Sequence, residues 1–204
     1  MKTRMREISL LFGILFPLLS FGQNSYTDSL ILEREIHDKQ FFEEVLNDEE
    51  RAIVKEICYF SIDTSYIVEA EFTPKKGKRF IMPMSSERIQ YYRSVGTLKF
   101  TVNGKGCSLQ LYKNLSSTDK TFKNYYFLPF RDGTSNVSTY GGGRYMDLIL
   151  TKQQLKGGKV EIDFNTCYHP YCAYSDRYSC PIVEASNRIE PKIEAGECYN
   201  LGEH

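Results

Sequence analysis

The amino-acid sequence predicts a mainly β fold: an antiparallel β-sandwich or barrel-like sheet, preceded by an N-terminal helix or helix pair. Helical spacing of apolar residues is confined to the chain before about residue 56, and beyond it short segments alternate apolar and polar side chains, with turn residues between them. The chain also holds 15 Tyr and 13 Phe, and aromatic side chains favour strands. Many short strands of this kind are typical of sandwiches and barrels.

The segment 27–47 is predicted to form the N-terminal helix. Thr27 or Asp28 can cap its start, because a short side-chain oxygen accepts a hydrogen bond from the first helical N–H groups. A second short helix is predicted over 48–56. The loose apolar stripe of the first helix consists of Leu30, Ile31, Phe41, Phe42 and Val45.

The strands begin with the segment 66–72, where Val68, Phe72 and their even-numbered neighbours lie on one side, as in a half-buried strand. Asn103 and Gly104 predict a tight hairpin turn, because both tolerate the positive φ that such a turn needs. The other strands are predicted at 79–82, 96–102, 108–112, 125–130, 144–150, 160–164 and 188–193.

The first 22 residues have the order of a secretory signal peptide. A basic start is followed by an apolar run from Ile8 to Leu19 and then by Ser20 and Gly22. The run is too short for a membrane span, which needs about 20 apolar residues. We therefore expect an exported protein, periplasmic or secreted, with no membrane span, in which residues 23–204 form a single β-rich domain.

The charge balance argues against one class of partner. The chain has 26 basic and 26 acidic residues, so it carries no positive excess that would attract nucleic acid or an anionic membrane. We expect no nucleic-acid partner. No feature of the sequence indicates a particular oligomeric state.

Six cysteines follow the export signal, and export permits disulfides. Their spacing alone does not select one pairing among the many that six cysteines allow. Cys172 and Cys180 are the candidate pair, because Pro170 and Pro181 bracket a loop short enough to bring the two thiols together. The alternative is that several of the cysteines are buried free thiols.

Three successive glycines, from Gly141 to Gly143, precede Arg144. Such a run can expose backbone N–H groups beside a guanidinium, a combination that suits a carboxylate or a phosphate. Arg144 is therefore the central candidate for binding a small or anionic ligand. The alternative is a structural bridge from Arg144 to Asp132 or Asp147.

A second polar segment, 163–181, contains His169, Cys172 and Cys180. These side chains are chemically able to ligate a metal, and Cys172 could act as a nucleophile with His169 as its base. Their spacing matches no zinc pattern, so a disulfide or buried thiols explain the cysteines better. We expect neither a metal nor a cofactor.

Both polar segments carry motifs of a known family. The motifs are Phe127-Leu-Pro-Phe-x-Asp-Gly-Thr, Thr139-Tyr-Gly-Gly-Gly-Arg-Tyr-x-Asp, Asp163-Phe-Asn, Pro170-x-Cys-Ala-Tyr, Cys180-Pro, Asn187-Arg and Ala195-Gly-Glu. In this order they resemble the bacterial and archaeal family catalogued as domain of unknown function 1684, over nearly all of the chain after the signal peptide. The resemblance implies no established activity. Cys172 and Cys180 match the family pattern, whereas the family usually has Asn at the position of His169, which argues against a catalytic or ligand role for His169.

The leading hypothesis is an exported domain that binds a small or anionic ligand near the glycine run. The first alternative is a hydrolase in which Asp132, Asp147 or Asp163 acts as acid or base while the arginine after the glycines stabilises negative charge. The second is a structural or interaction protein. The candidate ligand-binding residues are Asp132, Thr134, Tyr140, Arg144, Asp147, Asp163 and Asn165.

Overall fold

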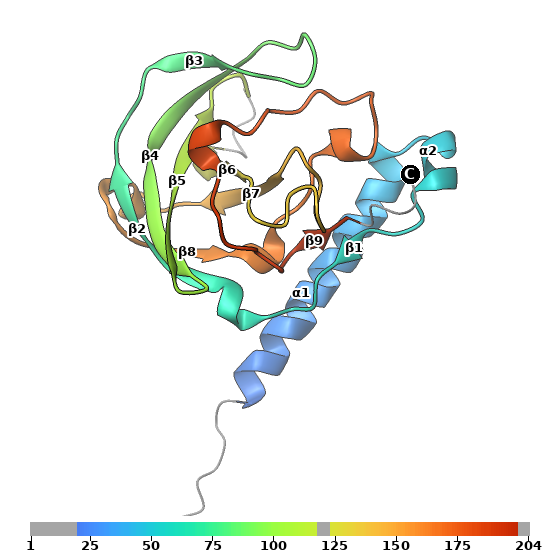
Figure 1. The fold of residues 1–204 in the computed structure, drawn as a ribbon, viewed down its shortest axis with the longest axis horizontal. Coiled ribbons are helices and arrows are strands. Elements are labelled where there is room, and N and C mark those ends of the chain that lie inside the picture. Colours follow the sequence, from blue (N-terminus) through green and yellow to red (C-terminus); the bar gives the residue numbers. More distant parts are fainter. Residues whose placement is uncertain (1–19, 118–122, 200–204) are drawn as a thin grey trace, which may run out of the picture.

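A curled antiparallel sheet and a long N-terminal helix dominate the structure, a computed structural model that describes residues 20–117 and 123–199. The sheet forms a half-barrel, and the helix α1 (Ser20–Gln40) crosses the opposite side of the molecule (Figure 1). The predicted mainly β fold with an N-terminal helix is therefore confirmed, in its barrel-like form.

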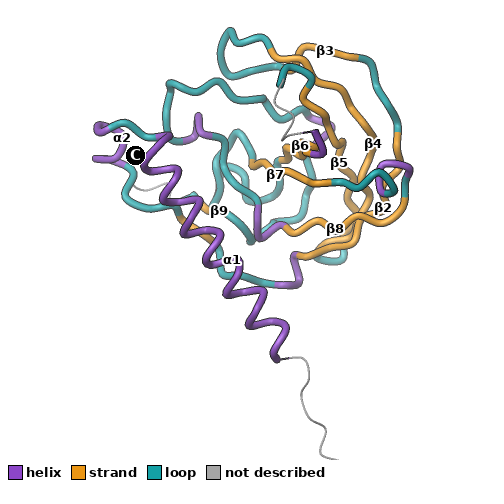
Figure 2. The backbone as a smooth tube through the Cα atoms, turned by 180° about the vertical axis from the view of Figure 1, so that it is seen from behind, coloured by secondary structure: helices purple, strands orange, loops and turns teal. Residues whose placement is uncertain are grey.

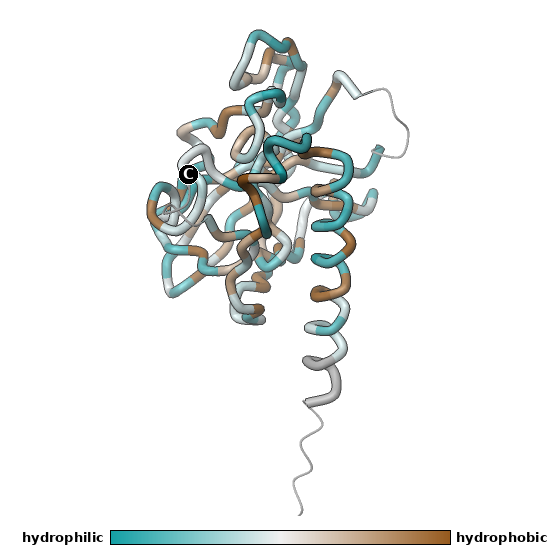
Figure 3. The backbone as a smooth tube through the Cα atoms, turned by 90° about the vertical axis from the view of Figure 1, so that its right-hand side faces the viewer, coloured by the Kyte–Doolittle hydropathy of each residue, from teal (hydrophilic) through white to brown (hydrophobic). Residues whose placement is uncertain are grey.

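α1 continues through a π-helical turn, Phe41–Val45, towards the short helix α2 (Asp48–Ile53). The predicted helix pair is thus present, but α1 begins at Ser20 rather than at a cap on Thr27 or Asp28. Polar and apolar residues alternate around α1, and its N-terminal end extends beyond the rest of the molecule (Figure 3).

A capping box fixes the start of α2. The side chain of Asn47 accepts a hydrogen bond from the backbone N–H of Glu50 at 2.8 Å, and the Glu50 carboxylate accepts one from the Asn47 N–H at 2.8 Å. These bonds satisfy two N–H groups that the helix itself leaves without partners. Glu50 also contacts Arg177 at 2.7 Å, which joins the end of the helical region to the C-terminal part of the chain.

The large sheet has the strand order β7-β6-β5-β4-β2-β8, with β3 paired to β4, and every pairing is antiparallel. The longest strands lie side by side at its centre (Figure 1). The strands are β2 (Ile67–Pro74), β3 (Arg79–Met82), β4 (Gln90–Val102), β5 (Lys105–Asn114), β6 (Tyr125–Phe130), β7 (Arg144–Ile149) and β8 (Gly158–Asp163).

The predicted hairpin turn joins β4 to β5. Asn103 has φ 49° and Gly104 has φ 71°, and the strands pair directly on either side of them, Val102 opposite Lys105. Positive φ at both central residues matches the right-handed twist of the two strands. This local signal was therefore sufficient to place the turn.

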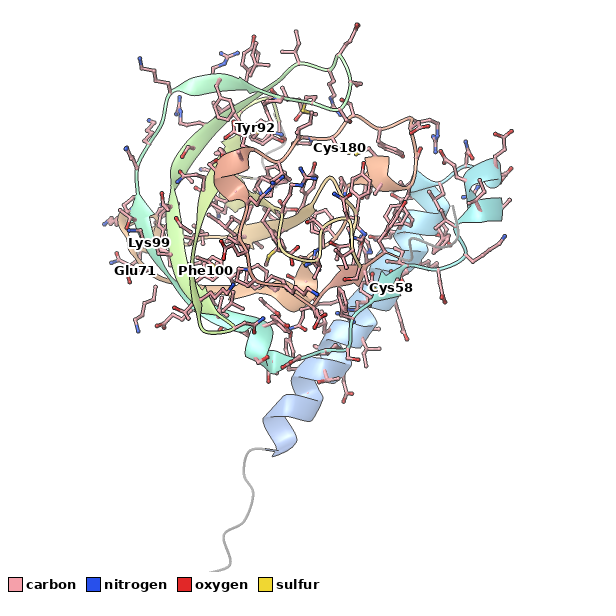
Figure 4. All side chains as sticks on the ribbon, viewed as in Figure 1. Cys58, Glu71, Tyr92, Lys99, Phe100 and Cys180 are labelled. Carbon is pink, nitrogen blue, oxygen red and sulfur yellow. A yellow bond between two sulfur atoms is a disulfide. The ribbon has the colours of Figure 1, made fainter. Side chains whose placement is uncertain are left out.

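Alternation along the strands separates the core from the solvent. In β2 and β4, Glu71 and Lys99 are register partners on the outer face, whereas Phe72 and Phe100 are buried on the inner face. Figure 4 shows Glu71 and Lys99 at the outer side of the sheet. The inner face of the curled sheet and the C-terminal segment together enclose the main core.

The chain after β8 consists mostly of loops and short turns (Figure 2). The strand predicted at 188–193 is absent, since only Arg188 makes a bridge there, with Arg131. Pro191 lacks an N–H group, and Ile193 donates its N–H to the Asp132 side chain at 2.7 Å instead of to a neighbouring strand. The apolar alternation was correct about burial of Ile189 and Ile193 but wrong about secondary structure.

A second, two-stranded sheet joins β1 (Cys58–Tyr59) to β9 (Glu197–Cys198). A disulfide links Cys58 to Cys198 across this pair, with a Cα–Cα distance of 4.9 Å. Cys172 and Cys180, the pair that the sequence suggested, are present instead as neighbouring free thiols. Register pairing of β1 with β9 brings the disulfide cysteines together, and their separation of 140 residues hides this from the sequence.

The predicted signal peptide covers residues 1–22, and residues 1–19 lie outside the described residues. Export therefore stays a prediction. Among the residues that the structure describes, no helix combines the length and the apolar character that crossing a bilayer requires.

Candidate functional site

Arg144 lies at the start of β7 and is 1 % exposed. Its guanidinium donates to three backbone carbonyls of the C-terminal segment: Ile193 at 2.7 Å, Glu197 at 3.2 Å, and Ala195. It also lies 3.4 Å from the Asp132 carboxylate. The structural bridge, rather than an open anion site, therefore describes Arg144, because its terminal N–H groups are directed at the protein itself.

Asp132 and Thr134 complete this buried cluster. The Thr134 hydroxyl donates to the Asp132 carboxylate at 2.8 Å, and Asp132 also accepts the backbone N–H of Ile193. The third glycine of the run, Gly143, has φ 97°, and a Cβ there would lie 2.5 Å from the carbonyl oxygen of Phe130. The glycine therefore allows close backbone packing, and the expected anion-binding loop does not fit this geometry.

Asp163 and Asn165 lie at the end of β8 and join three parts of the chain. Asp163 accepts hydrogen bonds from the Asn165 side chain at 2.9 Å and from the Tyr26 hydroxyl of α1 at 2.6 Å. The Asn165 side chain also bonds both backbone groups of Asp63, at 2.9 Å and 3.0 Å. These two predicted site residues thus hold α1 and the segment before β2 against the end of β8.

Tyr140 packs beside His169, with ring centroids 6.3 Å apart, and its backbone N–H donates to His169 Nε2 at 3.2 Å. His169 is 1 % exposed, and burial lowers its pKa to about 3. The imidazole is therefore neutral near pH 7. Its contacts are those of a core histidine.

Glu197 is a buried acid that the sequence suggested only as part of a motif. It is 2 % exposed, and its carboxylate accepts the backbone N–H of His169 at 2.8 Å and the Tyr174 hydroxyl at 3.1 Å. Burial raises its pKa to about 7. It borders a small cavity of about 150 Å³ that Arg34 and His37 also line.

Asp147 is the most exposed of the predicted site residues, whereas Tyr140 and Asp163 are half-buried and the others are buried. It accepts the Tyr168 hydroxyl at 2.7 Å, and desolvation by its neighbours nevertheless raises its pKa. Asp147 lies opposite Phe127 of β6 in the strand register. It therefore belongs to the face of β6 and β7 that points away from the main core.

That face forms a depression, which we call the aromatic hollow. Along β6 and β7 the main core takes Tyr126, Leu128, Met146 and Leu148, so the intervening residues face the other way. The hollow has a volume of about 390 Å³. It is lined by Tyr92, Lys113, Asn114, Ser117, Lys123, Tyr125, Phe127, Tyr145, Asp147, Tyr168 and Pro181.

Aromatic packing gives the hollow its walls. The Phe127 ring lies edge to face with Tyr145 at a centroid distance of 4.8 Å and tilts against Tyr92 at 5.7 Å. The Tyr145 hydroxyl donates to the carbonyl of Pro181, which fixes the C-terminal chain at the rim. Ring packing and a hydrogen bond within the chain therefore hold the walls in place.

The polar groups of the hollow carry both charges. Lys113 donates to the backbone carbonyls of Lys123 and Tyr125 at 2.8 Å and 2.9 Å, and burial lowers the pKa of its ammonium group. A carboxyl group with raised pKa and an amine with lowered pKa thus border one depression. Such shifts are typical of functional sites, although structural networks also produce them.

Sequence reasoning missed most of this hollow, since Asp147 is its one member among the seven candidate residues. The alternation in 125–130 and 144–150 contained the missing signal, because it separates the core-facing positions from those on the opposite face. Within the described parts of the chain, no group of three or more His, Cys, Asp or Glu residues could hold a metal ion.

The fold and the hollow define a mainly β protein with a curled antiparallel sheet and an aromatic depression on its non-core face. The chain belongs to the family described as protein of unknown function DUF1684, whose model matches residues 54–198. It is also similar to an uncharacterised protein of Haloarcula marismortui solved by solution NMR, with 32% identity and a TM-score of 0.69, covering 89% of this chain and 98% of that one. A comparison with the curated proteins finds no match.

Proposed function

We propose that this protein is exported and binds a small organic anion with a flat apolar or aromatic face in the aromatic hollow. The observation that carries the proposal is the hollow itself, about 390 Å³ lined by aromatic rings and a few polar groups. Binding sites for small molecules have this size and character. Phe127 and Tyr125 are among the lining residues and supply apolar contact area.

The charge of the ligand follows from the cations at the rim. Lys113 and Lys123 both line the hollow, against the single carboxyl group of Asp147. Two ammonium groups therefore face one carboxylate, so the charged side chains that line the hollow carry a net positive charge. An anionic group is therefore expected on the lysine side, with the flat part of the ligand over the rings.

The hydrolase alternative can also be placed in the aromatic hollow, with Asp147 as its acid or base. Asp132 and Asp163 are engaged in tethers between segments, whereas Asp147 borders the aromatic hollow. A raised pKa suits a group that donates a proton. Turnover of a phenyl ester in the hollow would favour that alternative over simple binding.

Thermal unfolding with defined probes tests the binding proposal. The anions benzoate and phenyl phosphate are each added to the purified protein, with benzyl alcohol as the neutral counterpart of benzoate. Phenyl acetate, a neutral ester, is added separately as the probe for hydrolysis. The anions are expected to raise the melting temperature by about 3 °C near saturation and benzyl alcohol by less, because a ligand stabilises the state it binds. Release of phenol is followed in the same samples and reports hydrolysis.

A charge-reversal variant at the rim gives the matched control. Lys123→Glu introduces repulsion at the hollow, whereas Lys99→Glu makes the same change on the exposed outer face of the sheet. The shift caused by the anions should disappear in Lys123→Glu and persist in Lys99→Glu. Equal shifts in both variants, or no shift with any probe in the wild type, would contradict the proposal.

A further inference from the structure

Two thiols lie against each other in the C-terminal segment, far from the disulfide. Cys172 belongs to a short turn, Tyr171–Ala173, and its backbone N–H points at the sulfur of Cys180 at a distance of 3.4 Å. Figure 4 shows Cys180 well separated from Cys58, which forms the disulfide beside α1. The two thiols are thus a separate sulfur pair within one loop.

The two members of the pair differ in access. Cys172 is partly exposed, whereas Cys180 is 9 % exposed and packs with Tyr145 and Val183. Cys180 is also fixed through its backbone, since its N–H donates to the Ser85 hydroxyl at 2.9 Å and its carbonyl accepts the Ser85 N–H at 2.8 Å. A reagent in solution therefore reaches Cys172 first, with Cys180 held in place behind it.

Hydrogen bonding distinguishes Cys172 from the other free cysteines. Its contact with the Cys180 thiol lowers the pKa of Cys172, helped by the hydroxyls of Ser85 and Tyr140, while the same contact raises the pKa of Cys180. Burial raises the pKa of Cys107, which is also partly exposed and has no such pair. The thiolate is the reactive form of cysteine, so Cys172 is the better nucleophile.

We propose that Cys172 and Cys180 form a thiol–disulfide exchange site, in which Cys172 attacks a small disulfide and Cys180 resolves the product. The co-reactant is a low-molecular-weight disulfide, for which oxidised glutathione serves as the probe. This inference is independent of ligand binding in the aromatic hollow.

The exchange has two balanced steps. In the first, the Cys172 thiolate attacks one sulfur of oxidised glutathione, the S–S bond breaks, and one glutathione thiolate leaves and takes a proton from water. In the second, Cys180 gives its proton to water and attacks the Cys172 sulfur of the mixed disulfide, which expels the second glutathione. The two protein thiols are oxidised to one disulfide, and one glutathione disulfide is reduced to two thiols.

Peptide mapping after incubation with oxidised glutathione at pH 7 tests the site. Free thiols are trapped by alkylation, and each cysteine is followed separately by mass spectrometry in the wild type, Cys180→Ser and Cys172→Ser. The wild type should form the Cys172–Cys180 disulfide. Cys180→Ser should stop at glutathione attached to Cys172, and Cys172→Ser should leave Cys180 unmodified, because Cys180 is shielded and holds its proton.

Cys107 provides the internal control in each sample. Alkylation of Cys172 in the reduced protein should be at least about tenfold faster than that of Cys107 at pH 7, since a lowered thiol pKa increases the thiolate fraction. Circular dichroism verifies that both serine variants are folded. Persistent glutathione on Cys172 in the wild type, or equal alkylation of Cys172 and Cys107, would overturn the proposal.

A redox titration distinguishes an exchange site from a Cys172–Cys180 disulfide that is only structural. The protein is equilibrated with reduced and oxidised glutathione at several ratios, and both sulfur pairs are mapped. An exchange site opens and closes within this range while Cys58–Cys198 stays bonded. If the two pairs open together or both stay closed throughout, the exchange site is excluded.

Discussion

Arg144 and Asp147 stand three positions apart on β7, and the structure uses them in opposite ways. Arg144 points to the core side, where it binds carbonyls of the C-terminal segment and contacts Asp132. Asp147 is exposed on the other side and borders the aromatic hollow. The comparison teaches that a polar residue in a motif can serve as an internal tether or line a binding site. Because side chains alternate between the two faces of a strand, the position along β7 decides which face each residue occupies.

The cost of burying polar groups explains the difference. A buried guanidinium requires acceptors for its N–H groups, and the C-terminal segment supplies the carbonyls of Ile193, Ala195 and Glu197. The segment thus binds the two terminal nitrogens of Arg144, while its buried Nε has no hydrogen-bond partner among the described residues. Asp147 in the hollow needs no such set of internal partners, because it is exposed and water can solvate its carboxylate.

The largest expected effect concerns the tether. Arg144→Met should lower the free energy of unfolding by about 3–5 kcal/mol, because it leaves the Asp132 charge buried without its partner and removes donors from three carbonyls. The matched change at an exposed site, Arg188→Met, should cost less than about 0.5 kcal/mol. Urea unfolding measures both, and a loss below about 1 kcal/mol in Arg144→Met would contradict the tether.

The sequence predicted the fold better than the site. The hairpin at Asn103-Gly104, the central strands and the helical start depend on local signals, and the structure has them. The tether at Arg144 and the disulfide of Cys58 depend on which distant segments meet, and nothing local encodes that. The aromatic hollow lies between these cases. Alternation along β6 and β7 predicts which strand residues face it, but nothing local predicts that Tyr168 and Pro181 of the C-terminal segment also line it.

The second effect comes from the disulfide, which fixes the same C-terminal segment that Arg144 binds. Replacing Cys58 and Cys198 together by Ala should reduce the free energy of unfolding by about 2–4 kcal/mol, because the bond restricts a long loop in the unfolded chain. Urea unfolding under non-reducing conditions measures the loss. An unchanged midpoint would show that this segment is held by the arginine cluster alone.

Glu197 allows a pH test of the same segment. Its pKa is raised by burial to about 7, above that of an exposed carboxyl, so the folded protein holds a proton that the unfolded chain releases. The stability from this group is fully present below about pH 4.5 and is lost as pH rises towards 7. Between about pH 5 and pH 7.5 the loss should approach 2 kcal/mol in the wild type relative to Glu197→Gln.

His169 contributes in the opposite direction, because its lowered pKa costs stability as pH falls below the ordinary pKa of a histidine. Both the wild type and Glu197→Gln contain His169, so subtracting one from the other removes its contribution. Glu194→Gln, an exposed change in the same segment, serves as the control and should show no such pH dependence. A constant difference between Glu197→Gln and the wild type across this pH range would show that Glu197 titrates like an exposed acid.

The smallest effect is expected at the hollow. Asp147→Asn should make the protein slightly more stable at pH 7.5, by less than about 1 kcal/mol, because desolvation raises the pKa of Asp147 and the amide oxygen can still accept the Tyr168 hydroxyl. The gain should vanish at about pH 2.5, below the ordinary pKa of an aspartate, where Asp147 is protonated in both folded and unfolded chains. Thermal unfolding at the two pH values measures it. A destabilised Asp147→Asn at pH 7.5 would mean that Asp147 is itself a structural partner, like Arg144.

The most direct test of the contrast between the two faces of β7 is a two-dimensional ¹⁵N–¹H NMR titration of the wild type with phenyl phosphate. Binding in the aromatic hollow predicts that the largest amide shifts fall on Lys113, Phe127, Asp147 and their neighbours, with the amides of Asp132 and Thr134 nearly unchanged. Shifts centred on Asp132, Thr134 and the glycine run, with none around Phe127 and Asp147, would contradict the account and restore the anion site at Arg144.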